Sequence, residues 1–197
     1  MDTLKAEKRS MDVTAKRWRR EGFVTGCIFG REIENSIPVK VKKTELEKLL
    51  KNNHKGSQIM LDVEGQQYDV LIKELDYNSL LGRYDEIDFQ ALVSNEKVHS
   101  VAEVVLLNHE KVVGGVLELV LPEISYKALP AALTDKVEID AAELRVGDTV
   151  KVKDLPFYSN PDIDVKSDPE AVVVTVVAVH NEVPEDEAEA DEKEADK

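Results

Sequence analysis

The chain has 197 residues, of which 26 are Lys or Arg, 40 are Asp or Glu and one is cysteine. This length allows one large domain or two small ones, and no apolar run approaches the roughly 18 residues of a membrane helix. The single Cys27 excludes an internal disulfide, and the Lys- and Arg-rich N-terminus lacks the apolar stretch of a signal peptide, so we expect a soluble, cytosolic protein.

Charge is distributed unevenly along this acidic chain. Residues 1–56 carry 14 Lys and Arg against 8 Asp and Glu, whereas residues 57–197 carry 12 against 32. A polyanion is attracted mainly by charges within about 10 Å. An acidic protein with such a basic region can therefore still bind RNA.

The first predicted helix, residues 14–20 (TAKRWRR), is strongly basic, with Thr14 as a possible N-cap and Gly22 just past its end. Its cations lie one, three and four residues apart, so several of them could contact one RNA backbone strand together. A solvated basic face is the simpler alternative. Trp18 either stacks on an unpaired base or anchors the helix to the rest of the domain.

A strand and a second helix are expected next. Residues 37–41 alternate like a strand, and Pro38 places them at a sheet edge or a strand start. Thr44 and Glu47 have the spacing of a capping box, and the leucines that follow share one helical face, with Gly56 as the stop signal.

Three strands complete the first region. Residues 58–63 and 67–75 flank a glycine-containing turn at 64–66, which predicts a hairpin. A loop at residues 78–84 and a strand at 86–93 follow. Residues 1–93 are therefore expected to form one β-rich domain with two helices.

New β patterns begin after this point, which predicts a second, predominantly β domain at residues 94–181. Its strands are expected at residues 99–107, 112–121, 124–128, 137–139, 150–152 and 172–179. The last of these is almost continuously apolar, which predicts burial on both faces. Residues 182–197 hold nine acids and two lysines, and we expect a disordered acidic tail that either increases solubility or contacts a partner.

Nothing in the sequence predicts catalysis, a metal site or a cofactor. His54, His99, His109 and His180 are scattered without metal-ligand spacing, and the chain has no glycine-rich phosphate loop and no GxSxG motif. The glycine pair at residues 114–115 indicates a strand kink or bulge. Cys27 lies in an apolar stretch, where an inert buried thiol is a better interpretation than a nucleophile. We therefore expect a protein that is not an enzyme.

Several segments, by their order and spacing, match a known family. They are LKAEKR (4–9), KRWRREG (16–22), IFG (28–30), IKELDYNSL (72–80), EIDF (86–89), KVVGGVLELVLPEISYKALP (111–130) and VGDTVKVKDLP (146–156). Over about residues 3–181 the chain resembles the bacterial large-subunit ribosomal proteins of the general stress protein Ctc type, which bind 5S ribosomal RNA. The resemblance implies a mainly β fold with a few short helices: a small N-terminal β-barrel that binds 5S rRNA, and a C-terminal β-rich domain.

The resemblance also implies which residues contact RNA. Carried over position by position, they are Arg9, Lys16, Arg17, Arg19, Phe29, Tyr77, Asn78 and Asp88. Arg20 is added on charge grounds. Phe29 stands where many members have Tyr, and Asp76 and Glu86 replace a Gln and a His, so two carboxylates would here repel phosphate.

The expected function is that of a non-catalytic structural protein of the large (50S) ribosomal subunit, which binds 5S rRNA in the cytoplasm and has the stress-response link of its family. We expect no membrane and no small-molecule substrate as partners. The acidic second domain is expected to project from the RNA or to meet a basic neighbouring ribosomal protein. The alternative is an acidic stress-induced protein that acts by protein–protein contact and binds RNA weakly or not at all.

Overall fold

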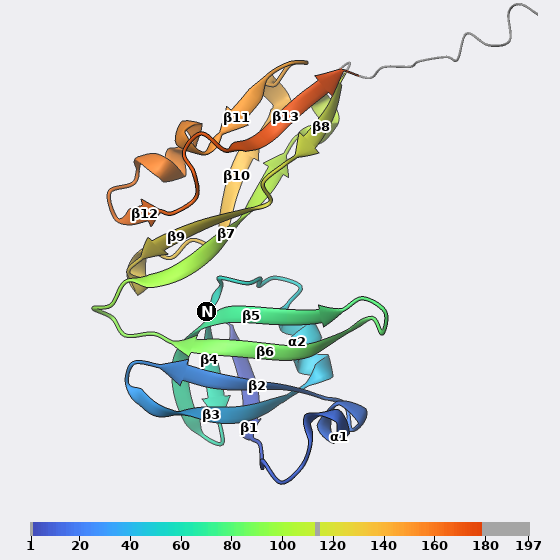
Figure 1. Cartoon of the computed structure of the whole chain (residues 1–197), viewed down its shortest axis with the longest axis vertical. Coiled ribbons are helices and arrows are strands. Elements are labelled where there is room, and N and C mark those ends of the chain that lie inside the picture. Colours follow the sequence, from blue (N-terminus) through green and yellow to red (C-terminus); the bar gives the residue numbers. More distant parts are fainter. Residues whose placement is uncertain (1, 113–114, 179–197) are drawn as a thin grey trace, which may run out of the picture.

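The computed structural model describes residues 2–112 and 115–178, which form two successive β structures (Figure 1). No helix in these two ranges is long and apolar enough to cross a membrane. The predicted acidic tail and His180 lie outside the described residues, as does Gly114 of the expected glycine kink.

The first structure is a closed barrel with the strand order β1-β3-β2-β6-β5-β4. Its strands are β1 (Thr3–Lys8), β2 (Phe23–Gly30), β3 (Ile33–Lys42), β4 (Gln58–Val63), β5 (Gln66–Asn78) and β6 (Arg83–Ala91). The pairs β1–β4 and β2–β6 are parallel and the other pairs are antiparallel. Side chains of β4 alternate between the core and the outside, so that Ile59, Leu61 and Val63 are all buried.

The predicted hairpin is confirmed, with a tighter turn and a longer second strand. Glu64 and Gly65 have φ values of 54° and 93°, so the turn has two residues and Gln66 already belongs to β5. The loop expected at residues 78–84 is wrong at both ends, because Asn78 pairs with Arg83 in the β5–β6 ladder. The β5–β6 hairpin extends beyond the body of the barrel (Figure 1).

The two predicted helices exist, as α1 (Ala15–Arg20) and α2 (Lys43–Leu49). Thr14 is the N-cap residue of α1, although its side chain makes no capping hydrogen bond. The capping box expected from Thr44 is wrong. The backbone N–H of Lys43 donates to Gly22 O at 3.0 Å, which starts the helix directly after β3 and places Thr44 inside its first turn.

The second helix also ends earlier than its glycine signal suggests. Leu46 and Leu49 are buried on one face, as expected, and the helix stops at Leu49 rather than at Gly56. The side-chain amide of Asn53 donates to Leu49 O at 3.1 Å and so satisfies one of the last carbonyl groups of the helix.

Proline in β3 is accommodated without an edge position. β3 lies between β1 and β2, so the prediction of an edge or a strand start is wrong. In a strand the N and C=O of one residue point to the same neighbour, and here Pro38 O accepts the N–H of Arg9 at 2.9 Å. The missing donor of Pro38 therefore faces the place where β1 has ended at Lys8.

Barrel closure between β2 and β6 depends on one glycine. A Cβ atom on Gly26 would lie 1.7 Å from Ile87 O and 2.8 Å from Ile87 C. Only a residue without a side chain allows the two backbones to come this close.

The second structure contains two sheets, with the orders β10-β7-β9-β12 and β11-β13-β8, around a core that includes Tyr126 and Phe157. The strands are β7 (Val98–Leu107), β8 (Gly115–Leu119), β9 (Glu123–Ala128), β10 (Lys136–Asp140), β11 (Thr149–Lys151), β12 (Ile163–Val165) and β13 (Val172–Ala178). Five 3-10 turns connect them: His109–Lys111, Pro130–Ala132, Ala141–Glu143, Val152–Asp154 and Pro156–Ser159. The strand expected at residues 112–121 is shorter than predicted, and β12 was not expected.

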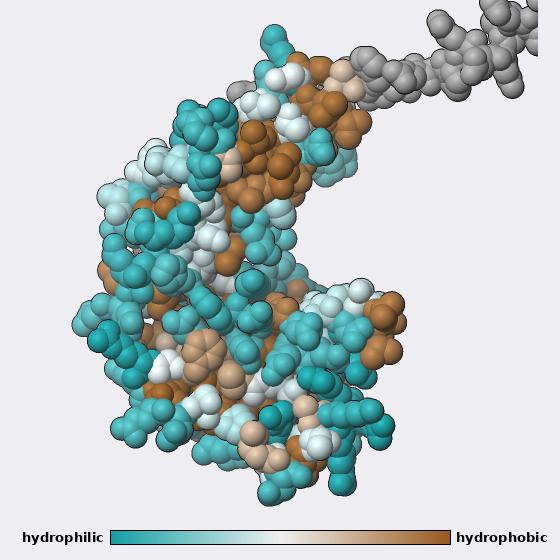
Figure 2. Space-filling view, in the orientation of Figure 1, coloured by the Kyte–Doolittle hydropathy of each residue, from teal (hydrophilic) through white to brown (hydrophobic). Residues whose placement is uncertain are grey.

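Burial of β13 on both faces is confirmed only for its first half. Val173 and Val174 are both fully buried, but Val177 is 47% exposed and pairs with Val116, which is 58% exposed. Within the described residues, no further layer covers the outer face of this sheet at Val116 and Val177, and Figure 2 shows apolar side chains gathered in this part of the molecule.

The barrel and the second structure meet at a close contact. Gly56 has φ +92°, and a Cβ atom there would lie 2.1 Å from Val101 O in β7. Ser100 Oγ donates to Gly56 O at 3.3 Å, and Lys73 Nζ donates to His99 O at 2.8 Å. His99 is thus an exposed strand residue at this joint.

Candidate nucleic-acid interface

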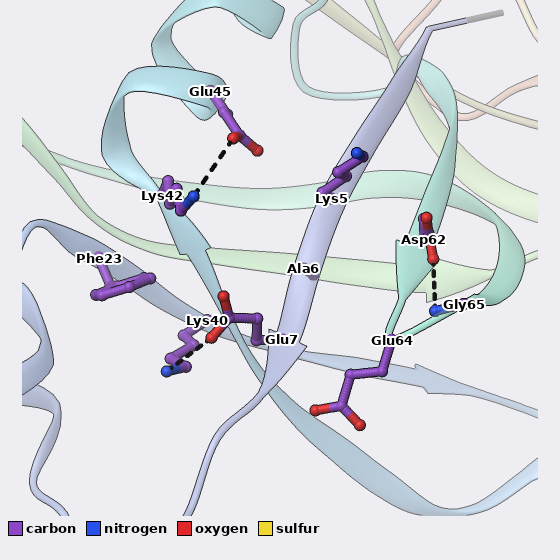
Figure 3. A pocket seen from close by; sticks show the side chains of 10 residues that line it. All are labelled: Lys5, Ala6, Glu7, Phe23, Lys40, Lys42, Glu45, Asp62, Glu64 and Gly65. Atoms are coloured by element: carbon purple, nitrogen blue, oxygen red, sulfur yellow. Dashed lines mark hydrogen bonds and ion pairs between the residues drawn. The ribbon is translucent and has the colours of Figure 1, made fainter.

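The basic helix α1 is held on the barrel by its tryptophan. The Trp18 ring packs edge-on against Phe23, with centroids 5.9 Å apart, and Lys40 Nζ lies 4.0 Å from the centroid of the Trp18 ring. Lys40 also forms an ion pair with Glu7 at 2.9 Å, and Figure 3 shows Lys40 between Glu7 and Phe23. Of the two roles considered for Trp18, this packing supports the anchor.

Because Trp18 faces the barrel, most of the cations of α1 face away from it. Lys16, Arg17 and Arg20 are exposed. Arg17 Nε contacts Glu21 Oε1 at 3.1 Å, and with this side chain 71% exposed such a pair contributes little to stability. These three residues form an exposed basic face that can approach a phosphate backbone.

Arg19 takes a different direction, toward the β5–β6 hairpin. Its Nε donates to Asp85 O at 2.9 Å and lies 3.9 Å from Asp85 Oδ1. Asn78, another predicted contact, donates from Nδ2 to Asp85 Oδ2 at 3.2 Å and accepts the N–H of Leu81 at 3.1 Å. The amide of Asn78 thus braces the hairpin, and one carboxylate links two of the predicted site residues.

Asp88 and Cys27 form a second polar group, on β6 and β2. Asp88 Oδ1 accepts hydrogen bonds from Cys27 N at 3.1 Å and from Cys27 Sγ at 3.3 Å. Burial and, after it, the neighbouring Asp88 carboxylate raise the pKa of Cys27 to about 11, whereas the charge of Arg9 acts weakly in the opposite direction. The thiol is half-buried rather than fully buried, and its raised pKa favours the interpretation of Cys27 as an inert thiol.

The remaining predicted residues, just after β1, on β2 and on β5, lie in different surroundings. Arg9 follows β1 and is half-buried, Phe29 is half-buried near the end of β2, and Tyr77 is 53% exposed and packs on Tyr84 at 5.0 Å. The Tyr77 ring offers a flat surface to a ligand, whereas most of Phe29 is covered.

Acidic side chains also occur on this surface. Glu74, Asp76, Glu86 and Asp88 line one hollow on the outer face of β5 and β6, where Asp76 is opposite Glu86 in the ladder. The candidate interface is therefore divided into a basic part around α1 and an acidic part beside it. Phosphate groups are attracted only to the first part.

Arg83 and Asp85 are functional candidates that the sequence interpretation missed. Arg83 and Asp85 lie on β6, the second strand of the β5–β6 hairpin, and Arg83 Nε donates to Asp85 Oδ1 at 2.8 Å. Residues 78–84 were expected to be a loop, so the alternation that brings Arg83 and Asp85 to one face of β6 was hidden.

The structure defines a class of protein with a small closed barrel, a cationic helix anchored on its surface and a second β structure, and the exposed cations of the helix are chemically suited to a polyanion. The comparisons make this class specific: residues 4–89 match the model of the Ribosomal L25p family, and residues 97–180 match that of the ribosomal protein TL5 C-terminal domain. The chain belongs to the ribosomal L25p family, in the form that carries this second domain. It is thus placed among ribosomal proteins and not among enzymes, as the sequence predicts.

Relatives resemble the chain over almost its whole length. The large ribosomal subunit protein bL25 of Carboxydothermus hydrogenoformans is 34% identical over 191 residues, which cover 95% of this chain and 94% of the relative. The bL25 protein of Bacillus pumilus is 34% identical and covers 98% of this chain, with 94% of its own length matched. That of Caldanaerobacter subterraneus is 30% identical, with 98% and 96% covered.

Proposed function

We propose that this protein is a structural component of the large ribosomal subunit in the bacterial cytoplasm, where its barrel binds 5S rRNA. The observation that carries the proposal is the orientation of α1: Trp18 packs on the barrel, so Lys16, Arg17 and Arg20 face solvent together. Membership of the L25p family and the names of the relatives, large ribosomal subunit proteins, support it.

RNA recognition by this surface is expected to depend on shape and charge. RNA helices display phosphates and 2′-hydroxyls along a wide, shallow minor groove. Arginine forks on α1 would contact phosphate oxygens. Asp88 Oδ2 accepts no hydrogen bond within the part of the chain that the structure describes, so it is available to a 2′-hydroxyl or a guanine amino group. The proposed RNA contacts thus combine the basic part around α1 with Asp88 in the acidic part beside it.

The direct test is charge reversal at two exposed positions of α1. Arg17→Glu with Arg20→Glu should weaken the binding of 5S rRNA to the full chain by about 100-fold or more at physiological salt, because two attractive phosphate contacts become repulsive. The matched control is Lys111→Glu with Lys136→Glu, which makes the same charge change at exposed positions of the second domain. Unchanged affinity of the α1 variant in a filter-binding assay would contradict the proposal.

The acidic hollow of Glu74, Asp76, Glu86 and Asp88 favours one alternative, a stress-linked protein that acts through protein–protein contact. Sucrose-gradient fractionation of a cell lysate separates the two functions. Our proposal predicts the protein in large-subunit and 70S fractions, and the alternative predicts it in the free fraction only.

A further inference from the structure

One nearly buried carboxylate lies between two arginines from separate elements of the barrel. Asp85 Oδ1 accepts a hydrogen bond from Arg83 Nε at 2.8 Å, and Arg19 Nε lies 3.9 Å from the same oxygen. The side chains of Asp85, Arg19 and Arg83 are 14%, 24% and 31% exposed. Both guanidinium groups are therefore held next to each other at the surface, where the α1 helix meets the β5–β6 hairpin.

Asp85 contacts both arginines through Nε, and this leaves their terminal nitrogens available. Within the part of the chain that the structure describes, no hydrogen bond or ion pair uses the Nη atoms of Arg19 or Arg83. An arginine fork binds a phosphate best with two parallel N–H groups. Two arginines anchored by Nε to one acceptor present such groups without further side-chain ordering, which lowers the entropic cost of binding.

The charge balance of this cluster also favours an anion. Two guanidinium groups share one carboxylate, which leaves a net positive charge. Burial acts to raise the pKa of Asp85, but the hydrogen bonds from Asn78 and Arg83 and the charges of Arg83 and Arg19 outweigh it and hold the pKa of this carboxyl below its usual value. The carboxylate thus stays ionised at neutral pH and keeps its hydrogen bond from Arg83, whereas Arg19 is held chiefly by the main-chain carbonyl of Asp85 at 2.9 Å. By contrast, Arg17 on α1 contacts the exposed Glu21, and its position is not fixed by the barrel.

We propose that Arg19 and Arg83 form a clamp for one phosphate group of the RNA backbone, with Asp85 as the residue that positions both. This inference rests on the proposed function and adds a binding residue, Arg83, and a positioning residue, Asp85. Because phosphate carries no base identity, the clamp contributes to affinity and to the register of the RNA on the barrel but not directly to sequence preference.

Asp85→Asn separates positioning from simple charge. The substitution removes a negative charge from an RNA-facing surface, so long-range electrostatics alone predicts tighter binding. The clamp predicts the opposite, because a neutral amide holds the Arg83 guanidinium less firmly and no longer attracts the charge of Arg19, which keeps only its hydrogen bond to the main-chain carbonyl. We expect 5S rRNA to bind the full-length Asp85→Asn variant about 5- to 10-fold more weakly than the parent chain.

Arg83→Gln tests the clamp without changing Asp85, its most buried residue. Affinity should fall about 10-fold, and the slope of log K against log salt concentration should become about one unit shallower, since one phosphate contact is lost. Arg83→Lys keeps the positive charge but not the forked guanidinium group, so its affinity for 5S rRNA should lie between those of the parent chain and Arg83→Gln. Arg145→Gln, at an exposed position of the second domain, removes the same charge and should leave both affinity and slope unchanged.

The outcomes distinguish this inference from the function on which it rests. If the parent chain binds 5S rRNA but Arg83→Gln behaves like Arg145→Gln, or Asp85→Asn binds as tightly as the parent or tighter, the clamp is refuted and the proposed function stands. If the parent chain does not bind, both are refuted. Circular dichroism melts of each variant establish that it is folded, and Arg83→Gln remains decisive even if Asp85→Asn is unstable.

Discussion

The most informative perturbation of the basic helix is the loss of its anchor, Trp18→Ala. Helix α1 has six residues, and isolated helices shorter than about 12 residues are marginal in water. Its helical state therefore depends on docking. The substitution removes the edge-on contact with Phe23 at 5.9 Å and the cation–π contact with Lys40 at 4.0 Å.

The expected magnitude follows from these two contacts. An aromatic pair contributes about 0.5–1.5 kcal/mol, and a largely desolvated cation–π contact about 0.5–2 kcal/mol. Docking of α1 should thus weaken by about 1–3.5 kcal/mol. If RNA binds only the docked helix, the Kd for 5S rRNA should rise by about 5-fold to at most about 300-fold.

Lys40→Met tests whether this loss comes from the anchor or from a lost base stack. The Lys40 side chain is only 12% exposed and lies beneath the tryptophan, so it does not form part of the exposed basic face. We expect Lys40→Met to weaken RNA binding by about 2- to 10-fold and to shift the fluorescence of Trp18, the single tryptophan of the chain, toward that of an exposed indole. Lys48→Met, an exposed lysine of α2, is the control for charge. Equal affinity and equal fluorescence for Lys40→Met and Lys48→Met would refute the anchoring role.

Two further predictions concern the β2–β6 closure. Gly26→Ala should lower the free energy of unfolding by more than about 3 kcal/mol, since its Cβ would meet Ile87 O at 1.7 Å. A Cβ atom on Gly65 would have no atom within 4 Å, so Gly65→Ala should lower the free energy of unfolding only by the about 1–2 kcal/mol that a left-handed backbone conformation costs a residue with a side chain. Urea unfolding of both variants measures the difference. With its pKa raised to about 11, Cys27 should be thiolate in only about one molecule per thousand at pH 8 and should react with iodoacetamide far more slowly than free cysteine. Asp88→Asn should speed this reaction, because one cause of the raised pKa is removed, and a rate for the parent chain equal to that of free cysteine would contradict the interpretation.

Sequence patterns predicted those elements whose structure depends on neighbours along the chain. The alternation of Ile59, Leu61 and Val63 and the glycine turn after them specify a hairpin locally, and the observed β4–β5 pair agrees. The strand β1 was not predicted, because only Leu4 and Ala6 alternate among charged residues over its six positions. Its pairing with β3 and β4 comes from tertiary contacts that no local pattern contains.

The candidate site was predictable to the same degree. The basic run that became α1 is visible in the sequence, and so is the family resemblance that pointed to Asp88. The link from Arg19 to Asp85 is not, because it joins residues 66 positions apart and depends on the parallel pairing of β2 with β6. The prediction of Thr44 as an N-cap residue was wrong for a related reason. Its capping motif is local, but the hydrogen bond from Lys43 N–H to Gly22 O, between residues far apart in the chain, fixes where α2 starts.

The two parallel pairings of the barrel have a consequence for folding kinetics. β1 pairs with β4, and β2 with β6, across connections of 49 and 52 residues, and such high contact order slows folding to milliseconds or seconds. During synthesis the barrel cannot close before β6 leaves the ribosome exit tunnel, and only closure brings Arg19 to Asp85. A partly folded chain therefore lacks the contact between Arg19 and Asp85, so RNA capture would select completed barrels over intermediates.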